Sequence, residues 1–459
     1  MSDLIQPTLI HTPAGDAIGP DSPGYDEARA LYNAMIDKKP RWIVRCANAA
    51  EVAEAIAYAR DHDLLLAVRG GGHNGAGLGS CDDGLVIDLS PMKAIKVDPR
   101  ARTVRVEPGC TQGDVDYAAR AYGLAVPAGI VSSTGIAGLA LGGGHGYLSR
   151  RYGLTIDNLL EAEVVLADGR IVRASADENP DLFWGLKGGG GNFGVVTSFL
   201  FRAHPVTSVY AGPIFFDVGH AAEIMRWYRD FLPTASRDLF PFLGLKTVPS
   251  CDPFPREIWG RRICALISVY NGSQEAGEAA MAPVRAALPE PLMDGMAQVP
   301  FADFQAAFAG LLPKGRQWYW KGDFVDELSD AAIAAHVEQF ARVPTAQSLV
   351  HLYPIDGAVQ DVGEGETPWG ARGATWSMVI AGIDTDPAKA PELKRWASDY
   401  WSALHAHSGH GGAYVNFMAG DEGEDRVRAA YGDNYDALVM LKRKYDPTNL
   451  FRVNQNIVP

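Results

Sequence analysis

The sequence predicts a mixed fold of helices and strands that is divided into two α/β domains. The chain has 459 residues, which is too long for one ordinary hydrophobic core. Strand-like and helix-like apolar spacing alternate in both halves. Glycine-rich stretches crowd the chain up to Thr207 and become sparse afterwards, so we expect a domain boundary between residues 208 and 209.

Composition and charge narrow the class of protein. Hydrophobic residues make up 47% of the chain and charged residues 21%, as in soluble globular proteins. The net charge of −14 argues against a nucleic-acid partner and against an anionic membrane surface. The 5 cysteines are scattered without a C-x-x-C pair, which predicts neither a disulfide framework nor a zinc ribbon. Because we find no signal-peptide pattern and no apolar run of membrane length, we expect a cytoplasmic protein.

The first half begins with a strand–helix–strand unit. In order, we expect a short helix (25–34), a strand (42–45), a helix (49–60) and a strand (64–68). These are followed by strands at 85–89 and 103–107, a helix at 113–122, a hairpin of 161–166 with 170–174, and a helix at 180–187.

A glycine loop directly after the strand at 64–68 is the first candidate site. It consists of Arg69, Gly70, Gly71, Gly72, His73 and Asn74. Glycine lets a ligand approach the backbone closely, converging N–H groups suit a phosphate, and Arg69 adds positive charge. His73 is the one side chain of the loop that can bond covalently to a cofactor ring. The alternative interpretation is a tight turn with a hydrogen-bonded histidine.

Two matches to G-x-G-x-x-G raise the alternative of a nicotinamide-dependent dehydrogenase. The first, at residues 70–75, follows a strand, but no helix can begin in the residues after it. The second, at residues 189–194, follows a helix instead of a strand. We therefore interpret both matches as false.

A second glycine-rich stretch covers residues 126–159. Large apolar residues such as Ile130 and Leu141 interrupt its glycines, so we do not interpret it as a solvent-exposed linker. We expect its backbone to pack against something large and flat.

The second half alternates strands with helices, which predicts a second α/β domain. The strands are expected at 214–218, 263–269, 348–353 and 375–381, and the helices at 221–232, 273–287, 331–341 and 391–407. The tail from residue 433 holds a further helix, which Asp446-Pro447 ends.

Five motifs follow one another along the chain. They are RGGGHN (69–74), PAG followed by LALGGGHGYLSRRYGL and DN (127–158), DLFWGLKGGGGNFGVVT (181–197), YVN (414–416) and YDPTNLFRVNQNI (445–457). Together they resemble the flavin-linked oxidases of the berberine-bridge-enzyme type, within the vanillyl-alcohol oxidase superfamily. The run at 138–142 is most similar to the 6-hydroxynicotine oxidase branch.

The resemblance implies an α+β fold. Residues 1–208 would form a PCMH-type FAD-binding domain of two α/β subdomains, residues 209–412 an α/β substrate domain with an antiparallel sheet, and residues 413–459 a segment that returns to the FAD domain. The resemblance also implies FAD attached covalently through His73. The cofactor-binding residues that it implies are Arg69, Gly70, Gly71, Gly72, His73, Asn74, Gly129, Ser133, Thr134, Gly135, Gly138, Gly142, Gly143, Gly144, Gly146, Asn158, Gly194, Val196, Asn454 and Asn456.

Two positions depart from the family pattern. Val131 stands where relatives with two covalent flavin bonds have a cysteine, so we expect a single bond. Leu139 stands where the berberine type has a histidine, and leucine cannot hydrogen-bond a flavin. These departures leave the substrate open among sugars, alcohols and amines.

Tyr414 matches the family tyrosine that lies over the flavin. Its ordinary pKa of ~10 means that a role as base requires a lower pKa or a concerted transfer. The alternative is a tyrosine that only stacks or hydrogen-bonds substrate. Asn416 would lie on the same side of a strand as Tyr414. His145 is a rival base, although a packing role is the simpler interpretation.

The resemblance implies an FAD-dependent oxidase that takes a hydride from a small-molecule alcohol, sugar or amine and reduces O₂ to hydrogen peroxide. A non-catalytic ligand-binding flavoprotein is a further alternative. Tyr319, Trp320 and Lys321 line a substrate cleft or belong to an ordinary half-buried strand. The three histidines at 405–410 have no carboxylate or cysteine at ligand spacing, so we expect no metal site.

Overall fold

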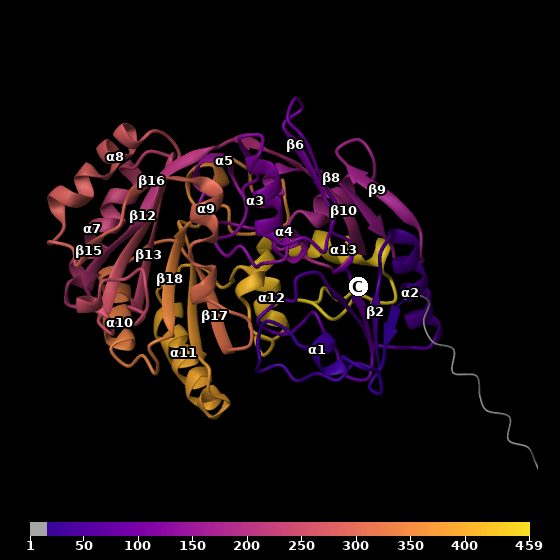
Figure 1. The fold of residues 1–459 in the computed structure, drawn as a ribbon. Helices are drawn as coiled ribbons and strands as arrows, with labels where there is room; N and C mark the ends of the chain where they lie inside the picture. The colour runs from indigo at the N-terminus through magenta and orange to yellow at the C-terminus, as the bar shows by residue number, and fades with distance from the viewer. Residues whose placement is uncertain (1–15) are drawn as a thin grey trace, which may run out of the picture.

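The structure is a computed structural model that describes residues 16–459, and it confirms the mixed α+β fold. Figure 1 shows a large sheet with its helices on one side of the molecule and smaller sheets with the N-terminal helices on the other. The C-terminal helices, coloured yellow, lie with the N-terminal part. The domain boundaries at 208 and 412 stay a prediction.

The first of the smaller sheets has the strand order β1-β2-β4-β3. Its strands are β1 (Asp16–Ile18), β2 (Trp42–Arg45), β4 (Leu85–Asp88) and β3 (Leu66–Arg69), of which the last three run parallel. Helix α2 (Ala49–Asp61) connects β2 to β3, and α1 (Tyr25–Arg29) precedes them. Asn48 caps α2 by accepting a hydrogen bond from the Glu51 N–H. The helical spacing of Val52, Ala55, Ile56 and Ala59 buries one face against this sheet.

The second of the smaller sheets is antiparallel and has the order β5-β6-β10-β8-β9. Its strands are β5 (Ile95–Asp98), β6 (Thr103–Val106), β10 (Val195–Arg202), β8 (Leu159–Val165) and β9 (Ile171–Ser175). A short pair, β7 (Leu124–Ala125) with β11 (His204–Pro205), lies beside it. The remaining α-helices before residue 208 are α3 (Gln112–Arg120), α4 (Ile136–Leu141), α5 (Ser149–Tyr152) and α6 (Pro180–Leu186).

The large sheet is antiparallel, with eight strands among the described residues in the order β15-β12-β14-β13-β18-β19-β17 and β16 paired to β12. The strands are β12 (Ser208–Asp217), β13 (Leu239–Thr247), β14 (Arg262–Tyr270), β15 (Met293–Asp294), β16 (Ala297–Pro300), β17 (Gln317–Val325), β18 (Leu349–Pro354) and β19 (Trp376–Asp384). The predicted antiparallel sheet of this half is therefore confirmed.

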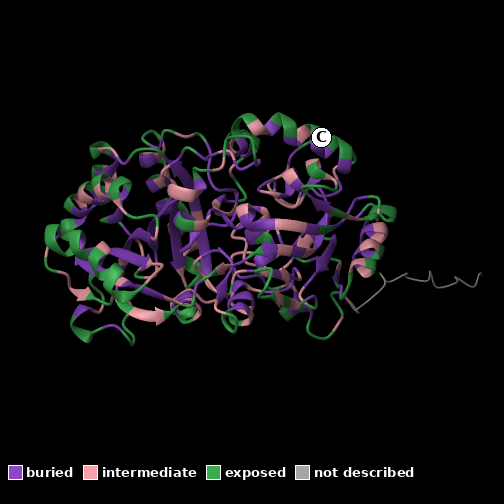
Figure 2. Cartoon of the chain, turned by 90° about the horizontal axis from the view of Figure 1, so that it is seen from above, coloured by how far each residue is buried: buried purple, intermediate pink, exposed green. Residues whose placement is uncertain are grey.

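Strand alternation divides the side chains of the large sheet between two faces. One face packs against α7 (Ala221–Phe231), α8 (Gln274–Ala287), α10 (Asp330–Phe340) and α11 (Ala390–His405), whose outer sides are exposed in Figure 2. The other face carries Phe242, Tyr353 and Val379 and packs against Tyr147 and Leu148 of the glycine-rich stretch. We call this second face the inner face; α9 (Phe301–Ala306) packs at its edge.

The tail is anchored in the N-terminal part. Helices α12 (Glu424–Tyr431) and α13 (Tyr435–Tyr445) bury Tyr431 and Leu438 in its core. The Nζ of Lys442, fully buried, donates to Asn192 O at 2.9 Å, to Asp446 Oδ2 at 2.8 Å and to Phe451 O at 2.8 Å. These bonds fasten the segment after Asp446 beside a third glycine-rich stretch, residues 188–207, which contains Asn192.

Strands β13, β15 and β16 of the large sheet and helices α4 and α5 of the glycine-rich stretch were not predicted, and β17 was expected only as one of two alternatives for residues 319–321. Strand β13 contains Pro241 and Gly244, which are both uncommon in strands. Helix α4 contains Gly138, which disfavours helix formation, so tertiary packing rather than propensity stabilises it.

None of the helices among residues 16–459 combines the length and apolar composition needed to cross a bilayer.

Arg150, from the SRRY turn of α5, joins the glycine-rich stretch to the large-sheet half. Its guanidinium is only 3% exposed and forms a two-bonded pair with Asp356, at 2.6 and 2.8 Å. It also donates to the backbone carbonyls of Ser236, Leu239 and Leu232. Removing the guanidinium would leave one buried carboxylate and three carbonyls without this donor.

We expect Arg150→Met to lower the free energy of unfolding by about 3–5 kcal/mol, because one partner of a buried pair stays behind uncompensated. The neighbouring Arg151 supplies a matched control, since its side chain is 49% exposed and its Asp238 contact is 3.3 Å long. Arg151→Met should cost at most about 1 kcal/mol. Urea unfolding of both variants measures the difference; equal losses would contradict this role of Arg150.

Candidate functional site

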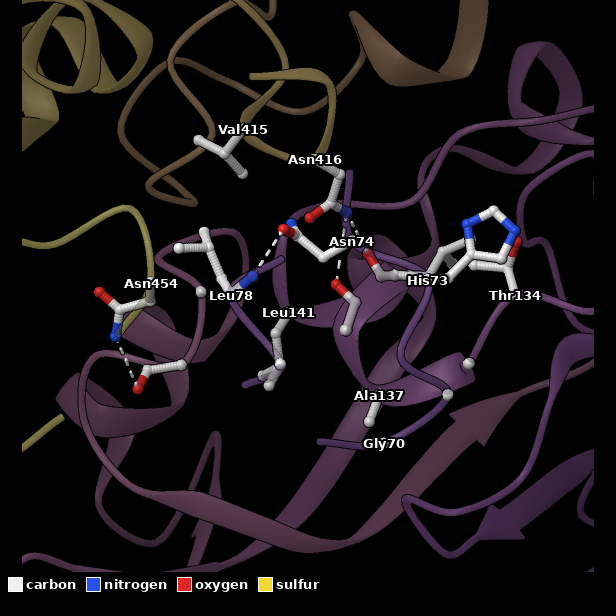
Figure 3. A pocket seen from close by; sticks show the side chains of 18 of the residues that line it. Gly70, His73, Asn74, Leu78, Thr134, Ala137, Leu141, Val415, Asn416 and Asn454 are labelled. Atoms are coloured by element: carbon white, nitrogen blue, oxygen red, sulfur yellow. Dashed lines mark hydrogen bonds between the residues drawn. The ribbon is translucent and has the colours of Figure 1, made fainter. Parts of the chain in front are cut away.

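A cavity of about 340 Å³ lies between the glycine loops and the inner face of the large sheet. Figure 3 shows side chains from the N-terminal part, the segment at 415–416 and the tail converging around it. Its wall draws on all three glycine-rich stretches, on β17, β18 and β19, and on residues 453–455. Segments that are far apart in the sequence therefore build one chamber.

The loop after β3 forms the first part of the wall. Arg69 is buried; its Nη2 donates to Asp88 at 2.9 Å, whereas its Nη1 has no hydrogen-bond partner among the described residues. A Cβ on Gly71 would lie 2.6 Å from Gly135 N, closer than atoms can approach. The absence of side chains at these two glycines is what brings the first and second glycine stretches together.

His73 lies in the wall and stacks on Tyr32, with ring centroids 3.7 Å apart and planes at 22°. Tyr32 is itself fixed, because its N–H donates to Gly72 O and its hydroxyl to Leu312 O. The Nε2 of His73 is buried without a hydrogen-bond partner in the described structure. Burial lowers the pKa of His73 to about 4, so its ring is neutral at pH 7. A neutral imidazole keeps a lone pair available for bonding.

The second glycine stretch forms the floor through α4. Gly138 faces open space, since, apart from its chain neighbours and the backbone of α4 itself, none of the described atoms lies within 4 Å of the position of its Cβ. Val131 and Leu139, the two departures from the family pattern, both line the cavity. None of the 5 cysteines, all within the described residues, does so.

Tyr414 and Asn416 approach the cavity from a 3₁₀ turn (Val415–Phe417), so the prediction of a strand here is wrong. The two side chains nevertheless meet: Asn416 Nδ2 donates to the Tyr414 hydroxyl at 2.7 Å. Gly144 N–H donates to the same oxygen at 3.0 Å. Asn416 also donates to the carbonyls of Gly138 and Leu139, bonds that Figure 3 draws. With two donors on its oxygen, Tyr414 keeps its own proton free to donate.

Burial raises the pKa of Tyr414 to about 12, and the bonds from Asn416 and Gly144 offset part of that rise. His145 lies next to it, with ring centroids 4.8 Å apart. Its Nε2 contacts Ser377 Oγ at 3.1 Å, and burial lowers the pKa of His145 to about 3. At pH 7 the site therefore contains a neutral phenol beside a neutral imidazole.

The tail closes the far end of the cavity. Asn454 Nδ2 donates to Gly191 O at 3.3 Å and to Phe451 O at 2.9 Å. Several buried polar atoms nearby have no hydrogen-bond partner in the described part of the chain: Asn454 Oδ1, Gln455 Nε2, Asn456 Oδ1 and the Tyr431 hydroxyl. Such atoms usually have partners, so this end is suited to a polar ligand.

The structure brings most of the predicted site residues into this wall. Those that line it are Arg69, Gly70, Gly71, Gly72, His73, Asn74, Gly129, Thr134, Gly135, Gly138, Gly142, His145, Gly194, Val196, Trp320, Tyr414, Asn416 and Asn454. Those outside the wall are Ser133, Gly143, Gly144, Gly146, Asn158, Asn456, Tyr319 and Lys321.

Packing explains several of the residues outside the wall. Tyr319 and Lys321 flank Trp320 on β17, so alternation turns them to the opposite face, where they contact Asp421 and Glu422. Asn158 donates to the carbonyls of Tyr152 and Leu154.

A Cβ on Gly143 would lie 2.9 Å from Trp369 Nε1, so the packing against Trp369 alone requires a glycine at this position. Two of the three histidines at 405–410 pair with carboxylates away from the wall: His405 with Asp323 and His410 with Asp326, each at 2.7 Å.

Sequence reasoning missed the inner-face residues Leu349, His351 and Tyr353 of β18. Their spacing of two, within an apolar run, was the available signal. It also missed Tyr32, for which the sequence carries no signal, because its role depends on the stack with His73.

The comparisons with known proteins agree with this site. The family model described as FAD binding domain matches residues 40–175, and the model described as berberine and berberine like matches residues 413–458. An FAD-linked oxidoreductase of Dictyostelium discoideum is 30% identical over 439 residues, which cover 93% of this chain and 91% of that protein.

Two further relatives concern nicotine. The (R)-6-hydroxynicotine oxidase of Paenarthrobacter nicotinovorans is 30% identical, with 100% of this chain and 99% of that protein covered. The crystal structure of 6-hydroxy-D-nicotine oxidase from Arthrobacter nicotinovorans has a TM-score of 0.87 at 26% identity, with 98% of each chain covered. The chain therefore belongs to the berberine-bridge-enzyme-like family of FAD-linked oxidoreductases.

Proposed function

We propose that this enzyme oxidises a CH–OH or CH–NH group of a small-molecule alcohol, sugar or amine, holds FAD covalently through His73, and passes the electrons to O₂ with formation of hydrogen peroxide. The observation that carries the proposal is that His73, the glycine loops and Tyr414 line one cavity. The similarity to 6-hydroxynicotine oxidase supports the reaction class.

The residues present fit FAD. Buried polar atoms without a hydrogen-bond partner among the described residues lie at both ends of the cavity. They are Arg69 Nη1 at one end and Asn454 Oδ1 and Gln455 Nε2 at the other, and they suit the polar parts of a dinucleotide. The open space over Gly138 suits a flat ring. The neutral His73 would hold the ring covalently. When bound, FAD supplies the two-electron acceptor that the side chains lack.

Tyr414 would handle the substrate proton. The hydrogen bonds that Asn416 and Gly144 donate to its oxygen stabilise the phenolate, which is the form of Tyr414 that can accept a proton. Because the pKa of Tyr414 is about 12, its phenolate is a minor form at pH 7. This form would take the O–H or N–H proton of the substrate as the hydride leaves the adjacent carbon, which leaves Tyr414 as a neutral phenol. His145 would remain neutral and orient Tyr414.

Gly138→Leu should lower FAD loading without unfolding the protein. The new side chain would enter open space in the cavity, and leucine favours helix α4 more than glycine does. Gly138→Ala, with one added carbon, should have a smaller effect. The ratio of flavin to protein absorbance measures loading, and thermal unfolding of flavin-free samples is the control. Full loading of Gly138→Leu would contradict this placement of the ring.

A spectrum and an anaerobic substrate screen test the proposed function. The purified protein should be yellow, and a member of a panel of sugars, secondary alcohols and cyclic amines should bleach the flavin. Admission of air should restore the colour and form hydrogen peroxide. Colourless protein with nicotinamide affinity, or yellow protein that nothing in the panel bleaches, would defeat the proposal.

A further inference from the structure

A second, smaller cavity of about 50 Å³ adjoins the first. The two share Ile130, Leu312, Leu349 and His351 as wall residues, so they lie side by side along these residues. The rest of the smaller wall is mainly apolar and aromatic: Tyr147, Phe215, Phe242, Phe254, Ala265, Ile267, Phe308 and Leu311. A volume of this size accommodates a group larger than one water molecule.

Lys246 is the exception in that apolar wall. It lies on β13 and is paired with Leu349 of the neighbouring strand β18. Leu349 is paired in turn with Ala381 of β19, and Ala381 with Trp320 of β17. The four residues therefore form one row across the sheet. Because neighbouring strands are ~4.8 Å apart, this row runs for roughly 14 Å across the inner face. Trp320, Ala381 and Leu349 line the first cavity, and Lys246 lies at the end of the row in the second.

The charge of Lys246 is not compensated. Among the described residues, no Asp or Glu lines either cavity, although the chain has a net charge of −14. Arg69, the other Lys or Arg side chain of the two walls, is paired with Asp88. Within residues 16–459 no carboxylate pairs with the Lys246 ammonium, and the guanidinium of Arg316 is a further nearby positive charge.

The surroundings disfavour this unpaired charge. Burial, with a smaller contribution from Arg316, lowers the pKa of Lys246 to about 8. The group is thus mainly charged at pH 7, in a setting where an isolated ammonium is costly. An anion brought into the smaller cavity would relieve that cost.

We propose that the substrate is an apolar, ring-containing molecule with a carboxylate, which lies along the row from Trp320 and places the carboxylate on the Lys246 ammonium. The apolar walls match the ring, and the charged end of the row matches the carboxylate. The inference rests on the proposed function, because it assigns the substrate of the same site.

Calorimetric titration of the holoenzyme at pH 7 tests the assignment. The probes are benzoate, phenylacetate and 3-phenylpropanoate, each compared with its amide. The carboxylates differ in reach, and each amide keeps the shape without the charge. We expect at least one carboxylate to bind at least ~10-fold more tightly than its amide, as for a charge-assisted hydrogen bond.

Substitutions of Lys246 identify the source of that preference. Lys246→Met keeps an apolar chain of similar length and should abolish the preference while leaving amide binding unchanged. Lys246→Arg should keep most of it. The control is Lys93→Met, at a lysine that is 57% exposed and away from both cavities, which should behave like the parent. Thermal unfolding and flavin content verify that the variants are folded.

Each remaining outcome overturns the assignment. If no carboxylate is preferred over its amide, or if the preference survives in Lys246→Met, the cavity does not recognise the anion through Lys246. The proposed function is tested separately, by the flavin absorbance of the same samples and by whether substrate bleaches it. Absent or unbleachable flavin defeats the proposed function, whereas the calorimetric comparison reports on Lys246 in either case.

Discussion

Tyr414→Phe protein will keep its flavin and bind substrate but will be reduced anaerobically at least ~100-fold more slowly than the parent at neutral pH. Phenylalanine keeps the ring, which packs against His145 and Phe417, and deletes the oxygen that Asn416 and Gly144 hold. A role limited to stacking would survive this change. Stopped-flow absorbance measures the rate, and a decrease of only a few-fold would exclude Tyr414 as the base and make His145 the next candidate.

The pH dependence of the flavin reduction rate also tests Tyr414 as the base. The active form of a base is the deprotonated one, and the pKa of Tyr414 is raised to about 12, so the reduction rate of the parent should increase as pH rises above neutral. His145, with its pKa lowered to about 3, should contribute no inflection between pH 5 and 8. An inflection near 6.5 in the parent would contradict a neutral His145.

Asn416→Leu tests how much the hydrogen bond from Asn416 contributes to the reactivity of Tyr414. It removes the 2.7 Å donor while leaving the phenol in place. Losing a donor disfavours the phenolate, so the pKa of Tyr414 should rise further and the rate at fixed pH should fall. High pH should restore part of the rate in Asn416→Leu but not in Tyr414→Phe. Identical pH profiles of the two variants would contradict this coupling.

His73→Ala protein will release all of its flavin on acid precipitation, whereas the parent will retain it. The prediction rests on a neutral imidazole with an unpartnered Nε2 in the cavity wall, and on Val131 where a second bond would need a cysteine. FAD should still bind noncovalently, since Arg69 and the glycine loops remain. Peptide mass analysis of the parent should place the flavin on the peptide that contains His73.

Cys110→Ser is the matched control for attachment, because Cys110 is the cysteine nearest to Val131 in sequence and lies buried outside the cavity wall. It should keep its acid-stable flavin in full. Acid-stable flavin in His73→Ala, or flavin on any cysteine peptide, would contradict single attachment through His73.

Local patterns determined much of this protein. Apolar spacing located β2, α2, β4 and the helices α7, α8, α10 and α11 of the large-sheet half to within a few residues, because such elements bury one regular face. The glycine loop, His73 and Tyr414 were recognisable from motifs, since close backbone approach and a particular functional group restrict the residue type. The motifs also indicated the family, which the comparisons confirm.

Only the tertiary structure decided which residues meet. Tyr414 contacts Gly144 across 270 positions of sequence, and Asn416 reaches it from a 3₁₀ turn rather than a strand. Tyr32 stacks on His73, and Lys246 joins the cavity through its register with Leu349. No local pattern encodes such contacts, because they arise where the large sheet closes over the glycine loops and long-range packing fixes position and burial together.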